Sequence, residues 1–157
     1  MPVRPSAPRL AALLVPLVTV ATALSAQAHP LVGKWAVEYE GGVQISNGER
    51  TTFRLKAELV VEAEGDSLIA TMRTEPPMGM SARPPTRMSA VRAAGPARFL
   101  RKSIAAVNTN GDERSMEVVS RWTLEARGDD LTGQFEVVNG GPDGDTSPRT
   151  VKGKRVG

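Results

Sequence analysis

Residues 53–72 are FRLKAELVVEAEGDSLIATM, and this stretch decides the fold. Apolar residues occupy every second position from Phe53 to Val61, and charged residues fill most positions between them. Successive side chains of a β-strand point to opposite faces of a sheet, so this alternation predicts a strand with one buried and one solvated face. Gly65-Asp66 then interrupts the pattern, and alternation resumes at Leu68. This is the pattern of two antiparallel strands joined by a tight turn.

The same period of two recurs along the rest of the chain. It predicts strands near residues 34–40, 53–62, 68–72, 116–125, 131–137 and 151–155, and less regularly over 86–93 and 98–108. Turns are expected at glycine-containing pairs between these runs, namely Gly41-Gly42, Asn47-Gly48, Gly65-Asp66, Asn110-Gly111 and Gly128-Asp129. The one long connection is expected at residues 75–85, which contain Pro76, Pro77, Pro84 and Pro85. Proline lacks the amide donor that a central strand needs.

Connections this short join neighbouring antiparallel strands into a meander. A meander with one apolar face must bury that face, and closing the sheet does so while removing both edge strands. We therefore predict an all-β fold, an antiparallel up-and-down meander of about eight strands closed into a barrel over residues 29–157. A two-sheet sandwich is the alternative architecture.

Residues 1–28 differ in kind from the remainder. Arg4 and Arg9 are their only charges, an apolar run extends from Leu10 to Leu24, and the segment ends in Ala26-Gln27-Ala28. A basic start, an apolar core and an A-x-A exit predict a signal-peptide helix that is cleaved after Ala28, and hence a secreted or periplasmic protein. A membrane anchor is the alternative, but the run spans only about 22 Å as a helix against a hydrocarbon core of about 30 Å. We expect no stable membrane insertion after cleavage.

Composition narrows the function classes. Loss of Arg4 and Arg9 lowers the basic count from 20 to 18 against 17 acids, so the processed chain is almost neutral and no nucleic-acid partner is expected. The chain has no cysteine, and its one histidine, His29, would be the first residue after cleavage. Thiol catalysis is therefore excluded and a Ser-His-Asp site is disfavoured. We expect a protein that is not an enzyme and needs no cofactor.

The segment Leu31-Val32-Gly33-Lys34-Trp35 resembles the Gly-x-Trp signature of lipocalins and related calycin barrels. The resemblance implies that Trp35 closes one end of an up-and-down barrel and that an arginine of the last strand packs over its ring. Arg155 matches that arginine. Stacking of guanidinium on indole contributes about 0.5–2 kcal/mol. The resemblance also implies a lipocalin-like domain over residues 29–157.

Our preferred hypothesis for function is binding of a small apolar or amphipathic ligand inside the barrel, because eight strands leave room for a packed core or one small ligand. The small residues Ala57, Ala70, Gly133 and Gly153 would leave space for it. The candidate ligand-binding residues are the large apolar ones on the inward phase, namely Phe53, Leu55, Leu59, Met72, Met116, Trp122 and Phe135.

Two alternatives remain open. In the first, the barrel is fully packed and the arginine-rich segment 73–102 meets an acidic partner or surface, since only Glu75 opposes its seven basic residues. In the second, the amino group and imidazole of a processed His29 bind copper, with Met78 and Met80 as thioether ligands. A lone histidine with no second histidine in the chain makes copper the weaker alternative.

Overall fold

The computed structural model describes residues 28–46, 48–76, 82–109, 112–140 and 144–157, and for residues 42–46, 50, 105–109 and 112–115 it describes the backbone alone. The strands are β1 (Gly33–Ser46), β2 (Glu49–Glu64), β3 (Ser67–Thr74), β4 (Thr86–Val91), β5 (Ala97–Thr109), β6 (Asp112–Arg127), β7 (Asp130–Asn139) and β8 (Arg149–Val156). They pair antiparallel in sequence order and β8 closes on β1.

The predicted fold class is thereby confirmed, and the sandwich alternative is wrong. The predicted signal-peptide helix lies in residues 1–27, outside the described residues. Within the ranges given above the chain is all-β, and it offers no helix able to cross a membrane.

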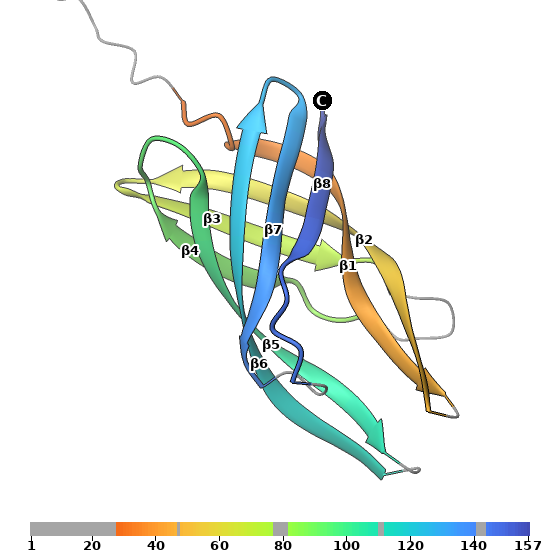
Figure 1. The fold of residues 1–157 in the computed structure, drawn as a ribbon. Helices are drawn as coiled ribbons and strands as arrows, with labels where there is room; N and C mark the ends of the chain where they lie inside the picture. The colour runs from red at the N-terminus through yellow and green to blue at the C-terminus, as the bar shows by residue number, and fades with distance from the viewer. Residues whose placement is uncertain (1–27, 47, 77–81, 110–111, 141–143) are drawn as a thin grey trace, which may run out of the picture.

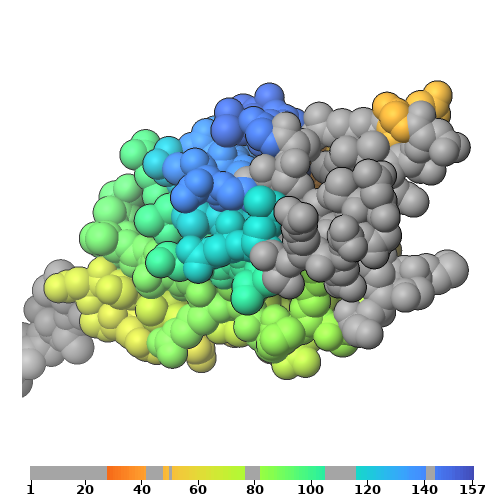
Figure 2. Space-filling view, turned by 90° about the horizontal axis from the view of Figure 1, so that it is seen from below, coloured from red at the N-terminus to blue at the C-terminus, as the bar shows by residue number. Residues whose placement is uncertain are grey.

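The two ends of the barrel differ (Figure 1). At one end the β1–β2 and β5–β6 hairpins project beyond the other strands, and we call it the hairpin end. The turn between β6 and β7 and the C-terminus lie at the opposite end, which we call the capped end. Seen from below in Figure 2, the described segments follow one another around the molecule from yellow through green and cyan to blue, as a meander requires.

Alternation along the strands produces the core. On β3 the buried residues are Leu68, Ala70 and Met72, and each is separated from the next by a partly exposed residue. Cross-strand register then places buried residues side by side, for example Leu59 beside Met72 and Trp122 beside Phe135. A single cluster of buried side chains from all eight strands forms the core inside the barrel.

The turn predicted at Gly41-Gly42 is wrong. Strand β1 continues through both glycines, and its register with β2 shifts between Glu40 and Gly42, which is a β-bulge. The hairpin turns at Gly48, within the turn predicted at Asn47-Gly48, and the φ of 78° at this glycine is the left-handed conformation that glycine adopts without strain. Its neighbour Asn47 lies outside the described residues.

The expected long connection at residues 75–85 does separate β3 from β4. A second long connection was not predicted: residues 140–148 join β7 to β8. Its composition, with Gly140, Gly144 and Pro148, suits a loop better than a hairpin turn.

The ladder between β4 and β5 is the weakest seam of the barrel. Its register pairs only Ser89 with Leu100, whereas β5 pairs with β6 from Ala97 to Thr109. Leu100 and its outward neighbours on β5 are exposed beside this seam.

Candidate functional site

The capped end is closed by Trp35 and Arg155. Trp35 is fully buried, and its Nε1–H donates to the carbonyl oxygen of Leu31 at 2.8 Å. The guanidinium carbon of Arg155 lies 4.2 Å from the centre of the indole ring. Arg155 also donates to the carbonyl oxygens of Val32 and Pro30, each at 2.9 Å. These bonds fasten the segment before β1 across the end of the barrel.

Gly33 is required at this closure. Its φ is 138°, and a Cβ at this position would meet Nη1 of Arg155. The three residues that carry the lipocalin resemblance therefore form one contact set, as the resemblance implies.

The barrel next to the capped end is filled. Leu59, Leu68, Leu124 and Leu131 are almost completely buried in it. The small residues expected to leave space do not all do so. A Cβ on Gly153 would lie 2.8 Å from Cγ1 of Val37, and one on Gly133 would meet the carbonyl oxygen of Thr123. The expectation of space beside these two glycines is wrong, because they allow close approach of neighbouring strands.

Toward the hairpin end the interior changes character. Trp122 and Phe135 stack with ring centroids 4.6 Å apart and an interplanar angle of 13°. Tyr39 stands edge-on to both, at 5.1 Å and 5.6 Å between centroids. Its hydroxyl shares a 3.0 Å hydrogen bond with that of Thr74, and Trp122 Nε1 donates to Ser120 Oγ at 2.9 Å.

Two arginines complete this region from the inner face. The guanidinium carbon of Arg101 lies 5.7 Å from the centre of the Trp122 ring, and that of Arg149 lies 5.8 Å from the centre of the Phe135 ring. Arg149 is only 12% exposed and pairs with Asp145 of the β7–β8 connection at 3.4 Å. Arg101 Nη2 donates weakly to Thr86 Oγ1 at 3.5 Å. We call this set the hairpin half of the interior; it comprises Tyr39, Arg101, Ser120, Trp122, Phe135 and Arg149.

One buried polar atom of the hairpin half has no hydrogen-bond partner among the residues that the structure describes. The Nε of Arg101 is buried, and no described group accepts a hydrogen bond from it. Burial of a charged donor without an acceptor is costly, and such an atom calls for an explanation.

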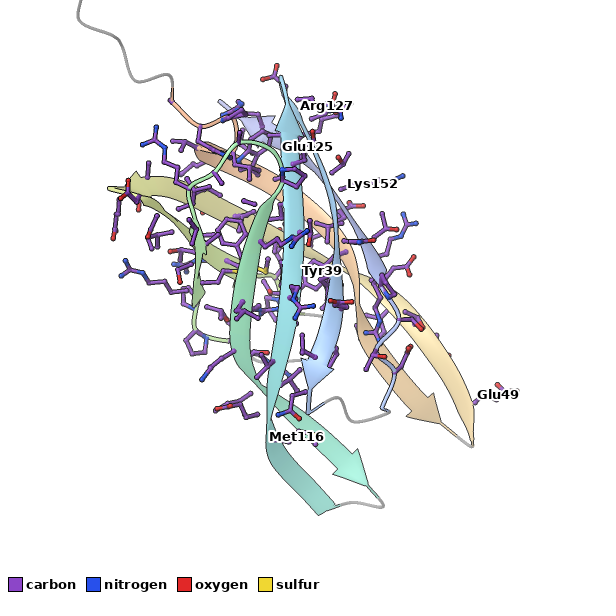
Figure 3. The ribbon with its side chains drawn as sticks, turned by 60° about the vertical axis from the view of Figure 1, so that its left-hand side comes forward. Tyr39, Glu49, Met116, Glu125, Arg127 and Lys152 are labelled. Carbon is purple, nitrogen blue, oxygen red and sulfur yellow. The ribbon has the colours of Figure 1, made fainter. Side chains whose placement is uncertain are left out.

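The predicted ligand-binding residues divide along the barrel. Leu59, Met72, Trp122 and Phe135 are buried in the core. Leu55 is partly buried against the core, and Phe53 and Met116 are partly exposed. Figure 3 shows Tyr39 at mid-height, Met116 closer to the hairpin end, and Glu125 and Arg127 at the opposite end. The set therefore runs along the barrel and does not form one compact pocket.

The sequence prediction missed Tyr39, Arg101 and Arg149 as site residues. The two arginines could have been found from the alternation of inward and outward residues along their strands. Arg101 is two residues after buried Phe99, and Arg149 is two residues before buried Val151. Strand periodicity therefore indicates an inward position for both arginines. They were missed because only large apolar residues were taken as ligand-binding candidates, and Arg101 was counted with the arginine-rich segment 73–102.

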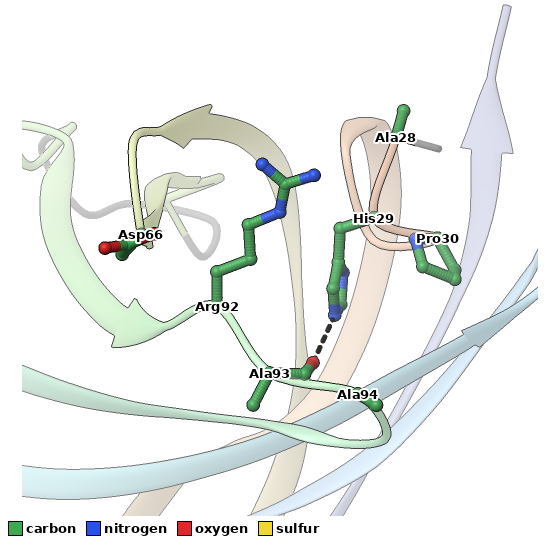
Figure 4. A pocket seen from close by; sticks show the side chains of 7 residues that line it. All are labelled: Ala28, His29, Pro30, Asp66, Arg92, Ala93 and Ala94. Atoms are coloured by element: carbon green, nitrogen blue, oxygen red, sulfur yellow. Dashed lines mark hydrogen bonds between the residues drawn. The ribbon is translucent and has the colours of Figure 1, made fainter. Parts of the chain in front are cut away.

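A surface pocket of about 630 Å³ lies at the start of the described chain, lined by Ala28, His29, Pro30, Asp66, Arg92, Ala93 and Ala94 (Figure 4). His29 Nε2 bonds the carbonyl oxygen of Ala93 at 3.1 Å, and Nδ1 accepts the backbone N–H of Leu31 at 3.2 Å. Both ring nitrogens are thus engaged with backbone, which does not favour the copper alternative. Met78 and Met80 lie outside the described residues, so copper binding stays a prediction.

The arginine-rich segment 73–102 does not present one surface. Arg101 points inward, and Arg87 pairs with Glu64 at 3.1 Å. On the outer face of β5, however, Arg98, Leu100, Lys102 and Ile104 alternate with inward residues and are all exposed. Leu100 is 56% and Ile104 is 68% exposed, so this strip is both basic and apolar.

Comparison with known proteins yields no match, either to a protein family model or to a curated protein sequence. Inference about function therefore depends on the geometry described above.

Proposed function

We propose that this protein is an exported, lipocalin-like barrel that binds a small amphipathic molecule in the hairpin half and catalyses no reaction. The observation that carries the proposal is the change of lining along the barrel. The capped half is packed with aliphatic side chains, whereas the hairpin half combines three stacked or edge-on aromatic rings with hydroxyl and guanidinium groups. Ligand sites in barrels use this combination of apolar area and a few convergent polar groups.

Export is compatible with this architecture. The first hydrogen bond of the barrel closure uses His29, whose carbonyl oxygen accepts the N–H of Val32 at 2.9 Å. Cleavage after Ala28 would therefore leave every closure contact of Trp35 and Arg155 in place. Sequencing the N-terminus of the protein recovered from the periplasm or medium tests the cleavage, and a first residue other than His29 would contradict it.

Binding is tested by calorimetric titration of the processed protein with decanol and decanoate, each kept below its critical micelle concentration. We expect a 1:1 complex with at least one of them. Leu55→Gln, which places an amide on the inner face, should weaken binding at least tenfold, and Leu100→Gln on the outer face should leave it unchanged. Absence of binding by both probes would reject the proposal, as would equal effects of the two substitutions.

A second candidate function rests on the outer strip of β5. Exposed leucine and isoleucine between arginine and lysine suit an acidic protein partner that also offers apolar side chains. Capture of such a partner should weaken with rising salt and be lost in Leu100→Asp. Capture that is unchanged by this substitution would remove the candidate.

A further inference from the structure

We propose that Arg101 receives the anionic head group of a single-chain amphiphile, so that the ligand enters head first and its tail extends toward the hairpin end. This inference rests on the proposed function and specifies its ligand class.

Arg101 is placed as a receptor for an anion. It lies on the inner face of β5, between fully buried Phe99 and partly buried Ser103 on the same face, with its guanidinium carbon 5.7 Å from the centre of the Trp122 ring. Among the described residues, Arg101 makes one long hydrogen bond, from Nη2 to Thr86 Oγ1 at 3.5 Å, and its buried Nε has no acceptor. No described carboxylate pairs with it.

Arg155 shows what a structural arginine looks like in the same barrel. Its Nη1 and Nη2 donate to backbone carbonyl oxygens at 2.9 Å, and Nε lies 3.5 Å from Asp129 Oδ1. Each side of that guanidinium is therefore occupied. Compared with Arg155, Arg101 lacks a hydrogen-bond acceptor, because no described group accepts a hydrogen bond on the Nε side of its guanidinium.

An anion with oxygen acceptors would supply the hydrogen-bond acceptor that Arg101 lacks. Carboxylate and sulfate oxygens match the parallel N–H groups of a guanidinium, and charge-assisted hydrogen bonds are the stronger ones, particularly in a partly desolvated setting. The nearby Arg149 guanidinium, over the Phe135 face, adds positive potential at the same end of the aromatic stack. An uncharged alcohol would supply less of this interaction.

The direction of the tail follows from packing. Toward the capped end, an added methyl group at Gly153 already collides with Val37, and the surrounding leucines are buried. An alkyl chain has no space there. Toward the hairpin end, Phe53, Leu55 and Met116 are only partly buried, so they offer apolar surface that a tail would cover.

The test compares ten-carbon probes that differ only in head group: decanoate, decyl sulfate and decanol. We expect decanoate or decyl sulfate to bind the parent protein at least about tenfold more tightly than decanol. The comparison of the two anions shows whether the site prefers a carboxylate or a sulfate. Equal affinity of decanol and both anions overturns the head-group assignment while leaving the proposed function intact, whereas failure of all three probes overturns both.

The matched variants are Arg101→Met and Arg98→Met, inward and outward on the same strand. Arg101→Met should remove the preference for anions, leave decanol binding within about twofold, and not lower the melting temperature of the ligand-free protein, since it removes an unsatisfied buried donor. Arg98→Met should change none of these. Arg101→Lys keeps the positive charge but loses the parallel N–H groups of the guanidinium, so it should retain part of the preference for anions over decanol. If Arg101→Met still prefers anions over decanol, the head-group assignment is overturned. If Arg101→Met does not fold, Arg101→Lys takes its place, and an anion preference as strong as that of the parent overturns the assignment.

Discussion

Arg155, Gly33 and Trp35 show how three residues close one end of the barrel. The guanidinium of Arg155 covers the indole of Trp35 and fills the space that a side chain at position 33 would need. The energetic consequence is coupling: the residue at 33 matters partly because of the residue at 155.

We expect Gly33→Ala to destabilise the protein by about 1–3 kcal/mol, since it adds both strain at positive φ and overlap with Arg155. In an Arg155→Ala background the cost of Gly33→Ala should fall, because only the strain remains. A double-mutant cycle in urea measures this difference. Strictly additive effects of the two substitutions would contradict direct contact as the cause.

Trp35→Ala should lower the free energy of unfolding by about 3–5 kcal/mol, as for other large buried truncations. That is a large share of the roughly 5–15 kcal/mol available to a domain. Lys34→Ala, one residue earlier and exposed, should stay within about 0.5 kcal/mol of the parent. Chemical denaturation of the three proteins is the measurement, and similar midpoints for all three would contradict the closure role of Trp35.

Among single residues, the sequence predicted those that close the capped end better than those that line the proposed ligand site. Gly33, Trp35 and Arg155 could be assigned from a family resemblance. Arg101 lies on the inward phase of its strand, but phase alone was not enough to assign it, because a charged residue on an inward phase looks the same in sequence as a small error of phase. Only the surrounding side chains show that its Nε is buried and that its guanidinium lies over the Trp122 ring.

The strands themselves were largely predictable because most bury one face and expose the other. More buried and more exposed residues alternate on β2 from Phe53 to Glu62, on β3 from Ser67 to Arg73, on β6 from Met116 to Arg127 and on β7 from Asp130 to Glu136. The errors fall at glycines and loops. Gly41-Gly42 has the composition of a turn but forms a bulge, since Gly48 supplies the hairpin turn a few residues later. Composition alone does not distinguish a bulge from a turn when both use glycine.

The β4–β5 seam has a dynamic consequence. Its regular ladder pairs only Ser89 with Leu100, so the amides of β4 and β5 that face each other are held by fewer hydrogen bonds than those between β5 and β6. Local opening is easiest where backbone hydrogen bonds are few.

Native-state hydrogen exchange should therefore show the amides of β4 exchanging faster than those of β6 and β7. Addition of an amphiphile that binds in the hairpin half should slow exchange on β5 near Arg101 more than on β8 near Arg155. Equal protection of β4 and β6 would contradict the weak seam.

For the whole molecule, the two halves of the interior are lined differently. The capped half has a packed aliphatic core and a closure of three residues. The hairpin half carries the aromatic stack and the inward arginines, and the two projecting hairpins lie at its end of the barrel (Figure 1). A barrel with one sealed end restricts a ligand to the other, and the proposed function and its head-first orientation both follow from this asymmetry.

The measurement that tests this asymmetry most directly uses the two tryptophans, one in each half. Each indole N–H gives its own cross-peak in a ¹⁵N–¹H spectrum, and Trp35→Phe and Trp122→Phe assign the two peaks. On titration with decanoate or decanol, we predict that the Trp122 peak shifts and saturates while the Trp35 peak stays in place. A Trp35 peak that shifts while the Trp122 peak does not, or two peaks that remain unchanged at saturating probe, would contradict ligand binding in the hairpin half.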